Sequence, residues 1–174
     1  SADYYESVTG QKMTPDMIRQ SAKQGLVWGL AFMPVSSLVF WVVMTLVFFA
    51  VIKIGGGQGK LKQYFSVVGY SYVIPALYYL LVLVVSFITN DLYIEVPMTS
   101  LANFLDSGLQ GTAIYGIFKG IDVFSIWQYI VIAIGLFTVS GFKRKWPVYV
   151  IVAGYYAVNL AITAITTVMS GRFV

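Results

Sequence analysis

The sequence contains no cysteine and no histidine. These absences exclude disulfides, thiolate metal sites and any nucleophile–base pair built on the two side chains. Charged residues are also scarce, at 10% of the chain, whereas 59% of the 174 residues are hydrophobic. A soluble domain has about 25% charged residues and rarely exposes large apolar patches. We therefore expect an integral membrane protein.

Four long apolar runs contain no Asp, Glu, Lys or Arg, and each is long enough to cross a bilayer, which takes about 20 residues. The runs cover about residues 28–52, 66–89, 123–142 and 147–169. Strands of a membrane β-barrel alternate polar and apolar residues in units of about 10, and these runs do not. The sequence therefore predicts an all-α fold, a polytopic transmembrane helical bundle formed by a single domain, residues 1–174.

The segment before the first run has the pattern of a helix that lies at the membrane surface. Residues 13–27 alternate apolar and basic positions with helical spacing, which favours a short amphipathic helix. Thr14 is expected to be its N-cap, and Pro15 suits its first turn. We assign residues 1–27 to an amphipathic segment outside the membrane.

The connection between the second and third runs, residues 90–122, is broken by glycines and charges. It cannot span a bilayer as one helix, and we expect it to lie outside. Residues 98–121 predict two short interfacial helices that are interrupted around residues 107–111. Asp122 immediately precedes the third run, where a carboxylate can cap exposed helical N–H groups.

Basic residues are distributed unevenly around the runs. The connections 53–65 and 143–146 contain no acid and hold six basic residues: Lys53, Lys60, Lys62, Lys143, Arg144 and Lys145. All seven acids lie in the other connecting and terminal segments. Because Lys and Arg near span ends stay in the cytoplasm, we predict that these two connections are cytoplasmic. An N-terminal segment outside then predicts that the chain is the C-terminal part of a longer protein with one further span, five in all.

The first of these connections, KIGGGQGKLKQYF, invites comparison with a phosphate-binding loop. A P-loop needs G-x-x-x-x-G-K-[ST], but Ile54 takes the place of its first glycine and Leu61 the place of its hydroxyl residue. We interpret the glycines as a helix C-terminus followed by a tight turn. They are Gly55, Gly56, Gly57 and Gly59. The basic residues of both connections are expected to contact lipid headgroups or a protein partner.

Two prolines and a row of small residues lie inside the runs. Pro34 and Pro75 each remove a helical hydrogen bond, so we predict kinks, with a transporter hinge as the open alternative. Ala153, Ala157 and Ala161 recur at every fourth residue of the last run, which allows close packing of helices.

The polar residues within the runs are uncharged. They include Thr45, Gln128, Asn159, Thr163 and Thr166, which we interpret as interhelical hydrogen-bonding groups that contribute about 0.6–2 kcal/mol each. An intramembrane serine protease needs a base and an aspartate protease needs two acids, and the runs supply neither. We therefore predict no enzyme activity, no cofactor, no bound metal and no nucleic-acid partner.

Two stretches carry a family resemblance. GGGQGKLKQYFSVVGYSYVIPAL is similar to a glycine-rich loop that leads into a Y-S-x-x-P helix, and GIDVFSIWQYIVIAIGLFTVSGFKR to an Asp/Phe-x-x-W segment followed by a Gly-Phe-Lys turn. Both features resemble the Yip family of Ypt/Rab-interacting membrane proteins. The matching residues are Gly55–Lys62, Gln63, Tyr70, Ser71, Pro75, Asp122, Phe124, Trp127, Gly135, Gly141 and Lys143.

The resemblance implies a five-span domain, of which this chain holds spans two to five, and it implies no enzyme activity. The sequence looks more like the bacterial branch, which implies the bacterial cytoplasmic membrane. Eukaryotic relatives act with small GTPases in vesicle traffic, and such a partner follows here only by analogy. We expect a scaffold, accessory or modulatory subunit of a membrane complex, whose partners are the bilayer and other membrane subunits. The alternative is a component of a small-molecule or lipid transporter or channel.

Overall fold

The computed structural model describes residues 15–89 and 96–171, and within these ranges it is helical with no strand. Its elements are α2 (Pro15–Ile54), α3 (Leu61–Ser71), α4 (Val73–Thr89), the 3-10 turns η1 (Leu101–Phe104) and η2 (Ser107–Leu109), α5 (Ala113–Gly120), α6 (Val123–Ser140) and α7 (Trp146–Gly171). The predicted polytopic helical bundle is confirmed.

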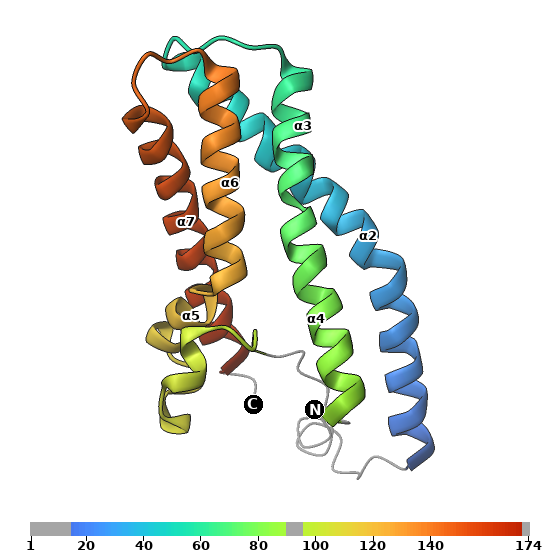
Figure 1. Cartoon of the computed structure of the whole chain (residues 1–174). Coiled ribbons are helices and arrows are strands. Elements are labelled where there is room, and N and C mark those ends of the chain that lie inside the picture. Colours follow the sequence, from blue (N-terminus) through green and yellow to red (C-terminus); the bar gives the residue numbers. More distant parts are fainter. Residues whose placement is uncertain (1–14, 90–95, 172–174) are drawn as a thin grey trace.

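Both short connections between long helices lie at one end of the bundle, which we call the loop end (Figure 1). There one connection joins α2 to α3, and the other joins α6 to α7. Residues 96–122, which include η1, η2 and α5, lie at the opposite end, which we call the α5 end. The six basic residues of the two connections thus lie at the opposite end of the bundle from Asp106 and Asp122, the acids within residues 96–122.

Within residues 15–89 and 96–171, four segments are long and apolar enough to cross a membrane: Val35–Ile54, Leu61–Thr89, Val123–Ser140 and Trp146–Ser170. The second span begins at Leu61, earlier than the apolar run, because Lys62 in its first turn does not prevent a helix. The third ends at Ser140, since Gly141 adopts a left-handed conformation with φ of 66° that terminates α6.

Helix α2 is continuous from Pro15 to Ile54. The structure therefore joins the expected surface helix and the first apolar run into one element of 40 residues. Pro15 starts this helix, as expected, whereas Thr14 lies outside the described residues. The backbone remains helical through Pro34, and Figure 1 shows that α2 changes direction along its length.

The second span is interrupted one turn before Pro75. This proline has no N–H to donate to the carbonyl of Ser71, four residues earlier. Helix α3 ends at Ser71, and the amide of Tyr72 donates to the carbonyl of Gly69 at 3.1 Å, which tightens the chain locally. The hydroxyl of Ser71 donates to Val68 O at 2.7 Å. The break at Tyr72 is the structural counterpart of the expected kink.

Two short helical elements lie within residues 98–121, the 3-10 turn η1 and the α-helix α5, on either side of the expected break around residues 107–111. Residues 101–104 form only the 3-10 turn η1. Side chains compete for the backbone here: Ser100 Oγ accepts from the amide of Ala102, and Asn103 Nδ2 donates to the carbonyls of Pro97 and Met98. Such local bonds favour turns over a continuing helix.

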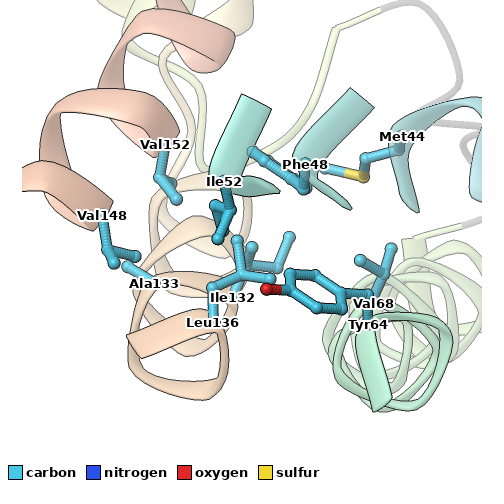
Figure 2. Packing of buried hydrophobic residues seen from close by; sticks show 10 residues of the cluster. All are labelled: Met44, Phe48, Ile52, Tyr64, Val68, Ile132, Ala133, Leu136, Val148 and Val152. Carbon is cyan, nitrogen blue, oxygen red and sulfur yellow. The ribbon is translucent and has the colours of Figure 1, made fainter. Parts of the chain in front are cut away.

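The hydrophobic core lies toward the loop end. Figure 2 shows side chains of α2, α3, α6 and α7 meeting there. They are Met44, Phe48, Ile52, Tyr64, Val68, Ile132, Ala133, Leu136, Val148 and Val152. Many large apolar side chains outside this cluster face outward, such as Phe87, which is 81% exposed. An outward apolar surface is the arrangement that lipid tails require.

At the α5 end, α5 packs closely on α7. A Cβ atom at Gly116 would lie 2.6 Å from the Cα of Ala164, and one at Gly120 would lie 2.6 Å from Leu160 Cδ2. These glycines therefore provide the close approach of helices. Ala153, Ala157 and Ala161 are exposed on α7, so their packing against a second chain or a partner stays a prediction.

We predict that Gly116→Ala lowers the free energy of unfolding by about 1–3 kcal/mol, because the added methyl group meets the backbone of α7. The matched control is Gly154→Ala on α7, where an added Cβ has nothing within 4 Å. Alanine should be neutral or stabilising there, since it favours helix by about 1 kcal/mol over glycine. Thermal unfolding in one detergent compares the two, and equal melting temperatures would contradict the close α5–α7 contact.

Candidate functional site

The glycine-rich loop begins as the end of helix α2. The amide of Gly56 donates to the carbonyl of Lys53 at 3.0 Å, and the amide of Gly57 donates to the carbonyl of Ile52 at 2.8 Å. Gly56 has a φ of 82°. This pair of bonds around a left-handed residue is the Schellman motif, which satisfies carbonyls that a helix end leaves without partners.

The loop is then fastened to the end of α6. The amide of Gln58 donates to the carbonyl of Ser140 at 2.6 Å. The hydroxyl of Tyr64, a fully buried residue of α3, donates to the carbonyl of Gln58 at 2.6 Å. Because both sides of Gln58 are bonded, the α2–α3 connection and the α6–α7 connection form one unit.

Small residues make this contact possible. A Cβ at Gly59 would lie 2.8 Å from the carbonyl oxygen of Val139, and Gly59 has a φ of 90°. A Cβ at Gly57 would lie 2.3 Å from Ile52 Cγ2 and 3.2 Å from the ring of Phe142. On the α6 side, the backbone of Gly141 faces the Gln58 side chain. The two chain segments therefore touch through their backbones.

All six basic side chains of the two connections are exposed around this unit, and we call them the basic loop surface: Lys53, Lys60, Lys62, Lys143, Arg144 and Lys145. Two are steadied by aromatic rings, since Lys53 Nζ lies 5.7 Å from the centre of Phe49 and Lys145 Nζ lies 5.8 Å from that of Phe137. The sequence predicts each connection separately, and the structure brings them together.

The loop amides are directed inward and do not form a phosphate cradle. The amides of residues 55–58 donate to protein carbonyls, and the amide of Lys60 donates to Gln63 Oε1 at 2.7 Å. A phosphate-binding loop needs such groups free for the ligand. The groups that remain available for an anion are the lysine and arginine side chains. The surface therefore suits anionic headgroups or acidic protein segments.

Among the described residues, no group of three or more acidic side chains is placed to hold a metal ion. Asp122 is instead a structural centre at the α5 end, where it is the N-cap of α6. Its Oδ1 accepts from the Thr99 hydroxyl, and its Oδ2 accepts from the amide and hydroxyl of Ser125 at 2.8 and 2.9 Å. A short backbone pairing between Ser100 and Asp122 holds this turn.

Comparison with known proteins places the chain in a family. The Yip1 domain matches residues 3–166, nearly the whole chain. The chain belongs to the Yip1 domain family. A curated relative, "Membrane protein YknW" of Bacillus subtilis (strain 168), is 28% identical over 122 residues, which cover 69% of this chain and 47% of the relative. The chain therefore spans about half the length of that relative. No solved structure matches.

Several of the residues that carry the Yip resemblance lie in the two contacts described above. Gly55–Lys62 and Gly141 build the joined connections, and Asp122 organises the α5 end. No motif in the sequence indicates that Gln58, Ser140 and Tyr64 link the two connections. A signal was present in the glycine at residue 141, which ends α6 in a left-handed conformation. The family motifs of this Yip1-domain protein therefore have a structural basis at both ends of the bundle.

We predict that Gly59→Ala lowers the unfolding free energy of this Yip1-domain protein more than Gly56→Ala does. Both residues have a positive φ, which costs a residue with a Cβ about 1–2 kcal/mol. Only the methyl group at residue 59 would also meet α6, since nothing lies within 4 Å of one at residue 56. Thermal unfolding of both variants measures the difference. Equal losses would show that the contact between the connections adds nothing to stability.

Proposed function

We propose that this Yip1-domain protein is a non-enzymatic accessory or modulatory subunit of a membrane complex, and that the basic loop surface is where it contacts its partner. One observation carries the proposal: the bond from Gln58 to Ser140 joins two distant connections into one fixed, exposed, positively charged surface. Neither the family nor the name of the relative indicates enzymatic activity.

The rigidity of the surface supports a protein partner in addition to lipid. Headgroup attraction needs only basic residues near the bilayer, each contributing about 1 kcal/mol, and places no demand on loop geometry. Here the loop has two crowded glycines, a buried tyrosine and two bonds on Gln58. A surface held in one shape loses little conformational entropy when a complementary surface binds to it.

The predicted topology supports the same proposal. The basic loop surface is in the cytoplasm if basic residues follow their usual distribution, and residues 96–122 are then outside. We infer that the protein lies in the bacterial cytoplasmic membrane, because the relative to which it is similar is a bacterial membrane protein. A partner that contacts the basic loop surface would then be a cytoplasmic protein or the cytoplasmic face of another membrane subunit.

The topology can be tested by cysteine labelling, because the chain has no cysteine of its own. Lys60→Cys and Asp106→Cys each place a thiol at an exposed position, one at each end of the bundle. In intact bacterial cells, a membrane-impermeant maleimide should label the cysteine at residue 106 and spare the one at residue 60 until the cells are opened. The reverse pattern would contradict the proposed orientation.

The partner surface can be tested by photo-crosslinking in native membranes. A photoreactive phenylalanine analogue replaces Trp146, which is 61% exposed beside the basic turn. We expect one discrete protein adduct. Its yield should fall about tenfold when Lys60, Lys62, Arg144 and Lys145 are all changed to Gln, since each surface charge contributes roughly 0.2–1 kcal/mol.

The matched control keeps the charge: Lys60→Arg, Lys62→Arg and Lys145→Arg together should retain the adduct. The adduct should also weaken as salt is raised, because exposed charges are screened. Adducts to lipid alone, with native purification that recovers the protein without companions in every detergent, would overturn the proposal of a partner subunit.

A further inference from the structure

A cavity of about 440 Å³ lies on the α5 side of the core, between α2, α4, α5, α6 and α7. In Figure 1, α2 and α4 diverge from α6 and α7 toward the α5 end. Met44, Tyr72 and Tyr155 line the cavity where it borders the core cluster. Its volume is within the range of about 300–1,000 Å³ that small-molecule sites have.

The lining of the cavity includes polar groups as well as apolar ones, although the cavity lies between membrane-spanning helices. Gln128 of α6 and Asn159 of α7 both contribute amides. Asn159 Nδ2 donates to the hydroxyl of Tyr129 at 3.2 Å, which leaves the tyrosine its own proton to donate. Polar groups in a bilayer are costly unless they have partners, so a cluster of donors from separate helices suits a polar ligand.

One lining residue is charged. Lys119, near the C-terminus of α5, is half-buried and lines the cavity beside Gly120. The neighbouring acid is Asp122, which is buried and is not part of the lining. Its oxygens already accept from Thr99 and Ser125. The charge of Asp122 still acts on Tyr156 of the lining, but the lining itself offers the cation Lys119 with the neutral amides of Gln128 and Asn159, a set of groups that suits an anionic ligand.

The surface around the cavity is apolar. Phe40 lines the cavity and is 67% exposed, and Pro75 on α4 lines it from the same side. A ligand with an anionic head could place the head near Lys119 and rest an acyl chain on the exposed apolar faces of α2 and α4. A free phosphate would leave these apolar groups without a partner.

We propose that this cavity binds the headgroup of an anionic phospholipid, with the phosphate held by Lys119 and the amides of Gln128 and Asn159. The site is distinct from the basic loop surface, because it lies on the far side of the core and faces the α5 end. It does not depend on the proposed partner, and it provides a specific place for a lipid within the bundle.

Native mass spectrometry of the delipidated full chain tests the proposal. The probe is an equal mixture of phosphatidylglycerol and phosphatidylcholine with identical acyl chains. We expect the wild type to retain one phosphatidylglycerol in preference to phosphatidylcholine. Lys119→Gln should weaken this retention about tenfold, which corresponds to about 1.4 kcal/mol. Lys119→Arg should retain most of it, because the charge is kept.

A second variant keeps the test decisive if Lys119→Gln fails to fold. Gln128→Leu removes an amide of the lining and should also weaken retention. Thr138→Leu on the same helix is the control, because Thr138 is exposed, donates to Ile134 O at 3.0 Å and is not among the residues that line the cavity. It should bind phosphatidylglycerol like the wild type.

Three results would overturn the proposal. The first is equal retention of the two lipids by the wild type. The second is unchanged retention in both Lys119→Gln and Gln128→Leu. The third is displacement of the lipid by millimolar inorganic phosphate, which would assign the cavity to a soluble anion.

Discussion

The hydrogen bond from the amide of Gln58 to the carbonyl of Ser140 is the contact on which the loop end depends. It gives a partner to a carbonyl in the last turn of α6, where the helix itself provides none. Such a short backbone contact requires that no side chain stand between the segments, hence glycine at residues 57 and 59. The Tyr64 hydroxyl completes the joint from below, where its ring enters the core.

The space between the helices is filled differently at the two ends of the bundle. At the loop end, backbone contacts and apolar packing fill the space between helices. At the α5 end, the helices diverge, and hydroxyls, amides and one buried carboxylate occupy the space. Tyr156 is an example of this polar contact between helices: its hydroxyl donates to the carbonyl of Gly120 at 3.1 Å and links α7 to α5. The core cluster at the loop end consists of uncharged side chains, whereas the interior at the α5 end contains the buried carboxylate of Asp122.

The sequence predicted the long helices well, because the bilayer sets both their length and their apolar character. It also located the N-cap role of Asp122, since capping acts within a few residues. Contacts between distant segments could not be predicted. Nothing local pairs Gln58 with Ser140, and the helical spacing of Ala153, Ala157 and Ala161 resembles a packing motif as closely as Gly116 and Gly120 do. The sequence also did not indicate that the helix at residues 101–104 is a short 3-10 turn. Its form depends on the side-chain hydrogen bonds of Ser100 and Asn103, which outweigh helix propensity there.

Because the core cluster lies toward the loop end, the two ends of the bundle should respond differently to a pulling force. A pulling force applied at residues 96–100 would act on α4, whose outward face is apolar, which contributes no residue to the core cluster and which contacts α6 through the rings of Tyr78 and Phe124. The break at Tyr72 is a natural place for α4 to swing away from α3. The same force applied at Gly57 would load several helices at once through Ile52, Tyr64 and Ser140. Extraction from the membrane should therefore proceed helix by helix from one side and as a single event from the other.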